Sequence, residues 1–395
     1  MGVDIHRHWR YLLADLDGTP ISFYDTQARQ RSIEYTLNDT TVIRGVINSD
    51  NPQANITFTD GFPYLSEGDR LLYAFRRDYD GGGSTYPWTC RAAGIIMQVN
   101  DTGGVDNADT EFVAYDPWQY LMSLPVVNTS FPSAGTYDVP YASINLDQIV
   151  VALIQNAHDT YTFANPAKTG IDLTSGTIES LPPATIEFQR ETSIGECLQQ
   201  CCELGCDIVL TPVYDPLRPG VMCELNVYAY AGDLRPDATF AWDKGRRSVV
   251  DDSRQIDGTQ RQNNVRYHLR AKADSTEGTD IATEGASVTR FGDYYGTQYF
   301  PAETSLTQLS EQVQQTLSEF SENKRTVSLG PVPERSPDPF TEWYLGDFVR
   351  VYASKKLRAS QSGYQRVTGF TVEISDDALE TVRDLRVYIP LEPAS

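Results

Sequence analysis

Four of the six cysteines lie close together in the chain, at Cys197, Cys201, Cys202 and Cys206. Thiolates are good zinc ligands, but the spacing C-x3-C-C-x3-C is not that of a zinc finger or knuckle, and histidine is missing nearby. Cys197 and Cys201 are one helical turn apart, and buried free cysteine is common on the inner faces of helices. The pattern therefore favours a packed helix face over a metal site.

A pair of carboxylates gives the strongest enzymatic signal. The stretch Tyr11–Thr19 is an apolar run followed by Asp-x-Asp-Gly-Thr. It resembles the first motif of the haloacid-dehalogenase-like phosphatases, which implies Asp15 as nucleophile and Asp17 as proton carrier beside Mg²⁺. That family needs a doubly wound parallel sheet and a lysine, yet the following 100 residues lack a convincing helix and the first lysine is Lys168. We favour a strand that ends in an Asp-Gly hairpin turn.

Other catalytic templates do not fit the sequence. The four histidines, at His6, His8, His158 and His268, form no HExxH motif, and there is no G-x-S-x-G elbow. Carboxylates are so numerous that a glycosidase-type pair remains open, although none can be named. We therefore assign no catalytic residue, cofactor or metal, and keep a hydrolase acting on phosphate esters or the cell envelope as the alternative function.

One stretch that occurs twice must be explained before any single motif. A Gly-Asp turn opens into an apolar run at Leu65–Phe75 and again at Tyr344–Ala353. Each is followed by a second glycine-led strand and then by a third strand, and the approach strands Ser32–Asn38 and Arg325–Gly330 are also alike. The same elements in the same order indicate a duplicated β-domain. The candidate repeat and assembly residues are Gly68, Asp69, Gly94, Gly346, Asp347 and Gly369.

Composition limits the possible partners. The chain has 395 residues, too many for one core, and its 32 basic and 54 acidic side chains give a net charge of −22. A nucleic-acid-binding surface needs clustered lysine and arginine, and this acidic chain has only short basic pairs. We therefore expect DNA to pass this protein without being held. No N-terminal signal peptide is recognisable in the sequence, and no apolar run is long enough for a membrane span. We therefore expect a soluble protein made in a cytoplasm.

The middle of the chain contains helices. Asn145 can cap a helix to about His158, and Ser193 with Glu196 forms a capping box for a helix that Gly205 ends. Two strands follow, at Asp207–Tyr214 and Val221–Ala231. The predicted organisation is a first β-domain at 1–120, a middle α+β region at 121–245, and a second β-domain at 246–395 with an amphipathic helix at 306–320. The apolar stripe of that helix could join three copies of the chain or pack on its own sheet.

With these elements in place, the chain resembles a known group, the baseplate-hub or tail-associated minor tail proteins of long-tailed, non-contractile phages of actinobacteria. The resemblance rests on four stretches: Thr59–Leu65, Ala114–Trp118, Asp207–Pro219 and Ser328–Pro333. It covers most of the chain, and each stretch alone is only moderately specific.

The resemblance implies both an architecture and a set of partners. Two similar antiparallel β-barrel tube domains would flank the inserted α+β domains in a mainly β chain. Three chains would then give six similar units, which is how a threefold tip joins a sixfold tube. The implied partners are a distal tail ring protein, a tape measure protein and other tail tip proteins, in a virion assembled in the host cytoplasm. DNA would pass without specific binding, and a host cell-wall binding module in residues 121–245 is a further alternative.

Overall fold

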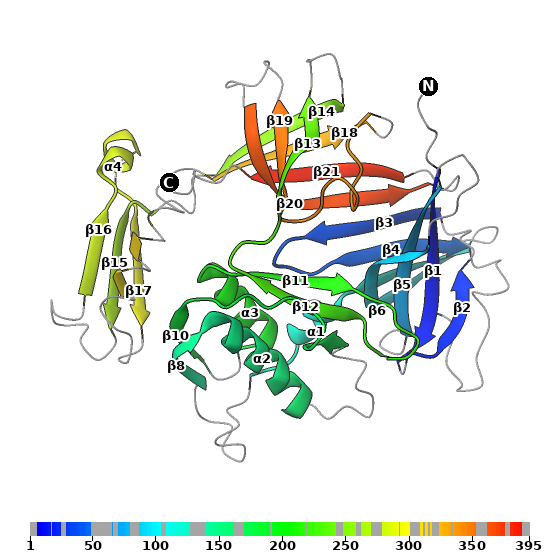
Figure 1. The fold of residues 1–395 in the computed structure, drawn as a ribbon, viewed down its shortest axis with the longest axis horizontal. Helices are drawn as coiled ribbons and strands as arrows, with labels where there is room; N and C mark the ends of the chain where they lie inside the picture. Colours follow the sequence, from blue (N-terminus) through cyan, green and yellow to red (C-terminus); the bar gives the residue numbers. More distant parts are fainter. Residues whose placement is uncertain are drawn as a thin grey trace.

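The computed structural model is mainly β, with a helical region in the middle of the chain (Figure 1). It describes residues 6–16, 18–24, 29–48, 65, 70–79, 87–103, 108–126, 139–160, 170–189, 192–218, 220–241, 248–257, 262–269, 279–291, 293–300, 309–310, 313–314, 317, 324–332, 335–352, 362–375 and 380–388. Within this part of the chain, no helix is long and apolar enough to cross a membrane.

A 13-stranded sheet forms the body of the molecule, and its strands come from the two ends of the chain. The N-terminal strands are β1 (His6–Asp15), β2 (Pro20–Tyr24), β3 (Arg29–Thr36), β4 (Val42–Asn48), β5 (Arg70–Tyr79), β6 (Thr89–Gly103) and β7 (Ala108–Tyr115). The C-terminal strands are β13 (Leu234–Ala241), β14 (Val249–Asp257), β18 (Lys324–Pro331), β19 (Phe348–Tyr352), β20 (Ser362–Ile374) and β21 (Glu380–Tyr388).

The two sets of strands pair in the same order. The N-terminal set runs β1-β5-β6-β7-β4-β3 across the sheet, and the C-terminal set runs β13-β19-β20-β21-β18-β14. Both series also follow the same order along the chain. Corresponding pairs are antiparallel in both sets except the first, since β1 pairs with β5 antiparallel and β13 pairs with β19 parallel. Such agreement over six strands shows that the connectivity of the sheet is repeated.

A bulge fixes how the two sets align. The register between β6 and β7 shifts between Ile96 and Gln98, with the extra residue in β6. The register between β20 and β21 shifts twice, and in the shift between Val367 and Gly369 the extra residue is likewise in β20. Ile96 therefore corresponds to Val367. This alignment corrects one sequence expectation, because β18 corresponds to β4 and not to β3. The strand that corresponds to β3 is β14, which is too polar to be recognised from its apolar pattern.

The two sets are joined edge to edge by β20 and β3, which lie side by side across the middle of the molecule (Figure 1). β20 is long enough to pair with β19 through its first half and with β3 through its second half. One hydrophobic core extends over both sets, and it includes Tyr11, Ile33, Phe240, Trp343 and Phe370. Burial of this shared apolar surface is the main force that holds the two sets together.

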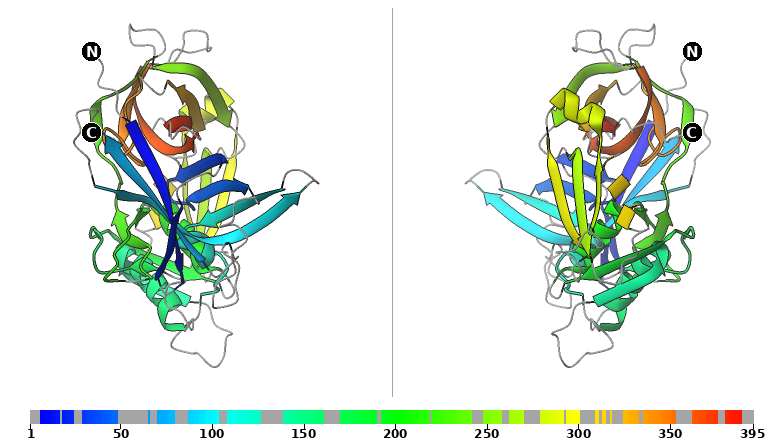
Figure 2. Two further views of the ribbon diagram at one scale, coloured as in Figure 1. Left: turned by 90° about the vertical axis from the view of Figure 1, so that its right-hand side faces the viewer. Right: turned by 90° about the vertical axis from the view of Figure 1, so that its left-hand side faces the viewer.

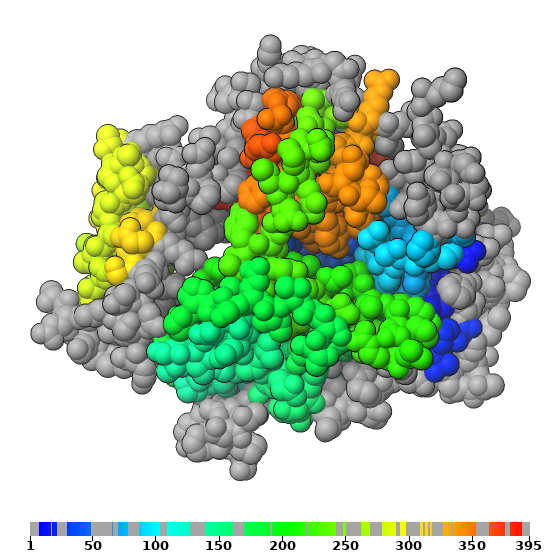
Figure 3. Space-filling model, in the orientation of Figure 1, coloured from blue at the N-terminus to red at the C-terminus, as the bar shows by residue number. Residues whose placement is uncertain are grey.

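The middle region packs below the sheet around its own core (Figures 1 and 3). Its elements are α1 (Pro117–Leu121), β8 (Val139–Asn145), α2 (Leu146–Thr160), β9 (Ile171–Asp172), β10 (Pro183–Phe188), α3 (Ile194–Glu203), β11 (Asp207–Pro212) and β12 (Cys223–Tyr228). The predicted capping box is present at α3, where Ser193 Oγ accepts from Glu196 N at 3.1 Å and Glu196 Oε2 accepts from Ser193 N at 2.9 Å. Gly205 then leaves the helix with a φ of +104°. The residues Leu234–Ala241 fall within the range expected for the middle region, but as β13 they pair with β19.

A small separate sheet lies to one side of the molecule (yellow in Figure 3). Its elements are β15 (Asn264–Leu269), β16 (Thr279–Thr283), α4 (Gly285–Phe291) and β17 (Tyr295–Phe300). Leu309, Val313 and Leu317 are buried against Val265 and Tyr267 of β15. The described residues of the predicted helix thus pack their apolar stripe on a sheet of their own chain, while Leu306 and Phe320 lie outside the described residues.

Candidate assembly surface

The Gly346–Asp347 turn connects the segment before β13 to the start of β19. Gly346 has a φ of +85°, and a Cβ there would lie 2.5 Å from Ala231 O. The buried Asp347 carboxylate accepts from Asp233 N at 2.7 Å, from Tyr344 N at 2.9 Å and from Arg235 Nε at 2.9 Å. Gly346 and Asp347 therefore both have structural roles. The close backbone crossing leaves no space for a side chain at Gly346, and the Asp347 carboxylate accepts hydrogen bonds from the backbone amides around it.

Gly369 lets an arginine cross the joint between the two sets of strands. A Cβ at this position would lie 2.6 Å from the guanidinium of Arg386. Arg386 Nη2 reaches over the glycine and donates to Thr36 Oγ1 at 3.0 Å and to Glu34 Oε1 at 3.4 Å, both on β3. The side chain of a β21 residue thus holds β3 across the intervening β20.

The two glycines expected to correspond, Gly94 and Gly369, differ in place and in role. Gly369 lies directly after the bulge, whereas Gly94 lies two residues before Ile96, where the bulge begins. A Cβ at Gly94 would meet Tyr115 O at 2.6 Å, so this glycine permits a close approach of β6 to β7. Gly68 and Asp69 lie outside the described residues.

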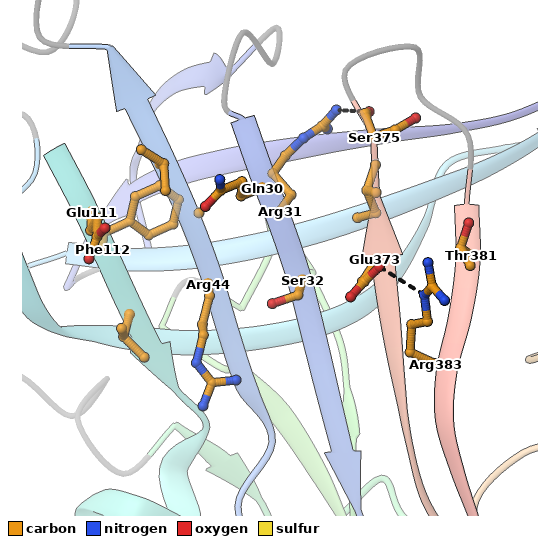
Figure 4. A pocket seen from close by; sticks show the side chains of 14 residues that line it. Gln30, Arg31, Ser32, Arg44, Glu111, Phe112, Glu373, Ser375, Thr381 and Arg383 are labelled. Carbon is orange, nitrogen blue, oxygen red and sulfur yellow. Dashed lines mark hydrogen bonds and ion pairs between the residues drawn. The ribbon is translucent and has the colours of Figure 1, made fainter. Parts of the chain in front are cut away.

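An open groove runs over the solvent face of the joined strands (Figure 4). It has a volume of about 880 Å³, and its lining comes from β3, β4, β7, β20 and β21. Two ion pairs lie in and beside it: Arg44 with Glu34 at 3.2 Å, and Arg383 with Glu373 at 3.1 Å. Arg31 Nη2 donates to Ser375 O at 3.0 Å. A broad, shallow face with paired charges suits contact with a large partner better than capture of a small molecule.

A buried network of polar side chains fastens the N-terminal strands to the C-terminal ones. Arg76 on β5 is fully buried, and it pairs with Glu380 of β21 at 2.9 Å and with Asp338 at 2.6 Å. Trp9 Nε1 on β1 donates to the same Glu380 oxygen at 2.9 Å. The arginine also stacks on Phe340, with 5.3 Å from Cζ to the ring centroid. A buried charge needs this degree of pairing to be tolerated.

A second buried network anchors the middle region to both sets of strands. Asp207, at the start of β11, pairs with Arg366 of β20 and accepts from Asn38 Nδ2 at 2.8 Å. Arg366 stacks on Tyr230 at 3.7 Å and donates to Ala231 O at 3.0 Å. Asn38, which has a φ of +59°, lies in the turn after β3. An ion pair and hydrogen bonds therefore link the middle region to β20 and to the turn after β3.

The fold that the phosphatase interpretation requires is absent around Asp15. β1 pairs antiparallel with both β2 and β5, and Gly18, with a φ of +82°, turns the chain from β1 into β2. Asp15 is the last residue of β1, and its carboxylate pairs with the buried Arg70 at 2.5 Å. The favoured hairpin turn is confirmed, and the described strands around Asp15 do not have the parallel arrangement that the phosphatase motif implies. Asp17 lies outside the described residues.

The cysteines of α3 are part of the core of the middle region. Cys197 and Cys201 are buried together with Leu198, as the helical spacing predicts, and Cys206, which follows the end of α3, joins the same core. Burial raises the pKa of the Cys197 thiol to about 12, which keeps it neutral and unreactive at physiological pH. Within the described residues, no group of three or more His, Cys, Asp and Glu side chains is placed to hold a metal ion.

Asp116 is a buried carboxyl that sequence reasoning did not single out. It caps α1 by accepting from Trp118 N at 3.1 Å, and it also accepts from Thr41 N at 2.8 Å. Burial raises its pKa to about 7, against the opposing effect of these hydrogen bonds. The Asp-Pro-Trp sequence is a recognisable signal for a helix cap. The burial of the Asp116 carboxyl, in contrast, depends on tertiary packing and has no local sequence signal.

Comparison with known proteins gives likeness in structure alone. No family model and no curated protein matches the chain. A tail protein from Neisseria meningitidis MC58 is similar with a TM-score of 0.60 and 12% identity, over 97% of each chain. The 43 kDa tail protein of prophage MuSo2 from Shewanella oneidensis gives 0.56 and 10%, over 96% of this chain and 98% of that one. Prophage tail protein gp18 from Listeria monocytogenes EGD-e gives 0.53 and 10%, over 97% and 95%. The chain therefore has the fold of phage tail proteins over nearly its whole length.

Proposed function

We propose that this protein is a structural phage tail protein that forms the hub at the distal tip of a tail. The observation that carries the proposal is the repeated strand order, β1-β5-β6-β7-β4-β3 and β13-β19-β20-β21-β18-β14. A chain with two similar units gives six units when three copies assemble. A trimer would therefore match a sixfold tail tube on one side and a threefold tip on the other. The fold likeness to three tail proteins supports the broader part of the proposal, a structural tail protein.

In this proposal each set of strands is one tube domain, and the trimer surrounds part of the channel through which DNA leaves. The net charge of −22 would keep DNA from adhering to it. The partners would be the distal tail ring protein, the tape measure protein and other tip proteins. We extend the proposal to tails of non-contractile actinobacterial phages on the four sequence stretches named above, and place the protein in the virion after assembly in the host cytoplasm.

The mass of the purified protein in solution tests the proposal directly. A trimer of 44.1 kDa chains has a mass of about 132 kDa, three times the chain mass. Light scattering coupled to gel filtration should give this value over a tenfold range of concentration. A monomer at every concentration would reject the trimeric hub.

A further inference from the structure

The joint between β20 and β3 shows how two tube units associate by strand pairing. β20 pairs antiparallel with β3, with Phe370 opposite Tyr35 and Val372 opposite Ile33. All four side chains are buried in the shared core. The chain thus contains one complete example of the contact between the two sets, formed by β20 of the C-terminal set and β3 of the N-terminal set.

The two strands that correspond to β20 and β3 each have an open edge. In the repeated order β6 takes the place of β20, and β14 takes the place of β3. Among the described residues, β6 from Gln98 to Gly103 pairs with β7 alone, and β14 pairs with β18 alone. The β6–β7 hairpin projects from the body of the molecule (Figure 2). An open edge presents unpaired N–H and C=O groups that another strand can bind.

We propose that β6 of one copy pairs antiparallel with β14 of a second copy, in the register of the β20–β3 joint. This inference rests on the proposed trimer for the number of copies, and it goes further by naming the interface. The occupant is a second copy because the chain already makes the equivalent contact with itself. The contact is head to tail, so it closes into a ring if the rotation between copies is one third of a turn.

The register follows from residues whose correspondence is fixed. Gly369 corresponds to Gln98 through the bulge. Val327 corresponds to Ile43, because Val327 lies opposite Val387 and Ile43 lies opposite the corresponding residue Ala114. Arg254 then corresponds to Ile33, because Arg254 pairs with Val327 and Ile33 pairs with Ile43. Transferring the β20–β3 register then sets Val99 opposite Ile256 and Asp101 opposite Arg254.

The two opposed pairs are chemically complementary. Val99 and Ile256 are both apolar, and Asp101 and Arg254 carry opposite charges. Asp101 is exposed in the single chain. Sliding the strands by two residues would place Asp101 opposite Ile256 or opposite Asp252, and both are unfavourable cross-strand pairs. The proposed register is therefore the one that the sequence of both edges favours.

Charge reversal tests the Asp101–Arg254 contact. Asp101→Arg and Arg254→Asp should each weaken the trimer on the order of tenfold or more, since each places like charges opposite one another. The double variant should restore association to within about threefold of the wild type. Asp237→Arg is the control, because Asp237 is an exposed acid on β13, outside both the groove and the proposed β6–β14 contact. It should leave the trimer intact.

A disulfide tests the register independently. Val99→Cys combined with Ile256→Cys should yield covalently linked dimers and trimers under mild oxidation, whereas Val99→Cys with Arg254→Cys, two residues out of register, should not. Trimers that survive both charge reversals and form no cross-link at positions 99 and 256 would overturn this interface and leave the proposed hub standing. A wild-type protein that stays monomeric would overturn both.

Discussion

Gly346 is a position where the neighbouring backbone leaves no room for a side chain. Its φ of +85° is one that other residues rarely adopt, and a Cβ would lie 2.5 Å from a main-chain oxygen that cannot move aside. We expect Gly346→Ala to lower the free energy of unfolding by about 3 kcal/mol, through strain and overpacking together. Chemical denaturation measures this loss. Gly285→Ala is the control, since a Cβ at Gly285 meets nothing within 4 Å; equal losses in the two variants would contradict the explanation.

Asp116 should make stability depend on pH in an unusual direction. Its pKa is about 7 in the folded protein, raised by burial from the ordinary value of 3.8, so the folded state binds a proton more tightly than the unfolded state does. The contribution of Asp116 is therefore fully present below about pH 4 and is lost as the pH rises through 7.

The difference in unfolding free energy between the wild type and Asp116→Asn isolates this effect from the many other carboxylates. The unfolding free energy of the wild type should fall steadily relative to that of Asp116→Asn between pH 4 and pH 7. The difference between the two should stay constant above about pH 8. A difference that does not change with pH would show that Asp116 titrates normally in the folded protein.

At the scale of the elements, Arg76 is the contact that links β5 to β21 and to the segment carrying Asp338. We expect Arg76→Ala to cost about 3–5 kcal/mol, because it removes the buried cation that pairs with the buried Glu380. Arg383→Ala, which removes an exposed pair with Glu373, should cost less than about 1 kcal/mol. Thermal unfolding of both variants makes the comparison. An Arg76 variant as stable as the Arg383 variant would mean that the network does not hold the strands together.

Local signals predicted the elements well. The capping box at Ser193 and the helix end at Gly205 were both predicted, because each is decided by residues within one turn. β4 was missed, since Gly45 interrupts its apolar pattern at the place where Phe112 lies over the strand. β13 was missed as a strand because Pro236 falls inside it, at a shift of register with β19. Other strands were missed as well, among them β8, β10, β16 and β17. In β4 and β13, the feature that hid the strand depends on a partner strand far away in the sequence.

The whole molecule was predicted only in outline. The duplication could be inferred from Gly346–Asp347 and the strands around it, yet one approach strand was aligned to the wrong partner, because β14 is polar where β3 is apolar. The β20–β3 joint could not be predicted, since Phe370 and Tyr35 are 335 positions apart (370 minus 35) and neither carries a local signal for pairing. The role of Gly369 is hidden for the same reason, as it depends on Arg386 crossing β20.

End-on imaging of the purified protein by single-particle electron microscopy tests the central claim most directly. A hub of three chains with two similar strand units each should appear as a threefold ring with six similar lobes around a central channel. The six lobes would follow from the strand order that occurs twice in the chain. Single particles of one chain, or a ring in which only three lobes are alike, would contradict the account.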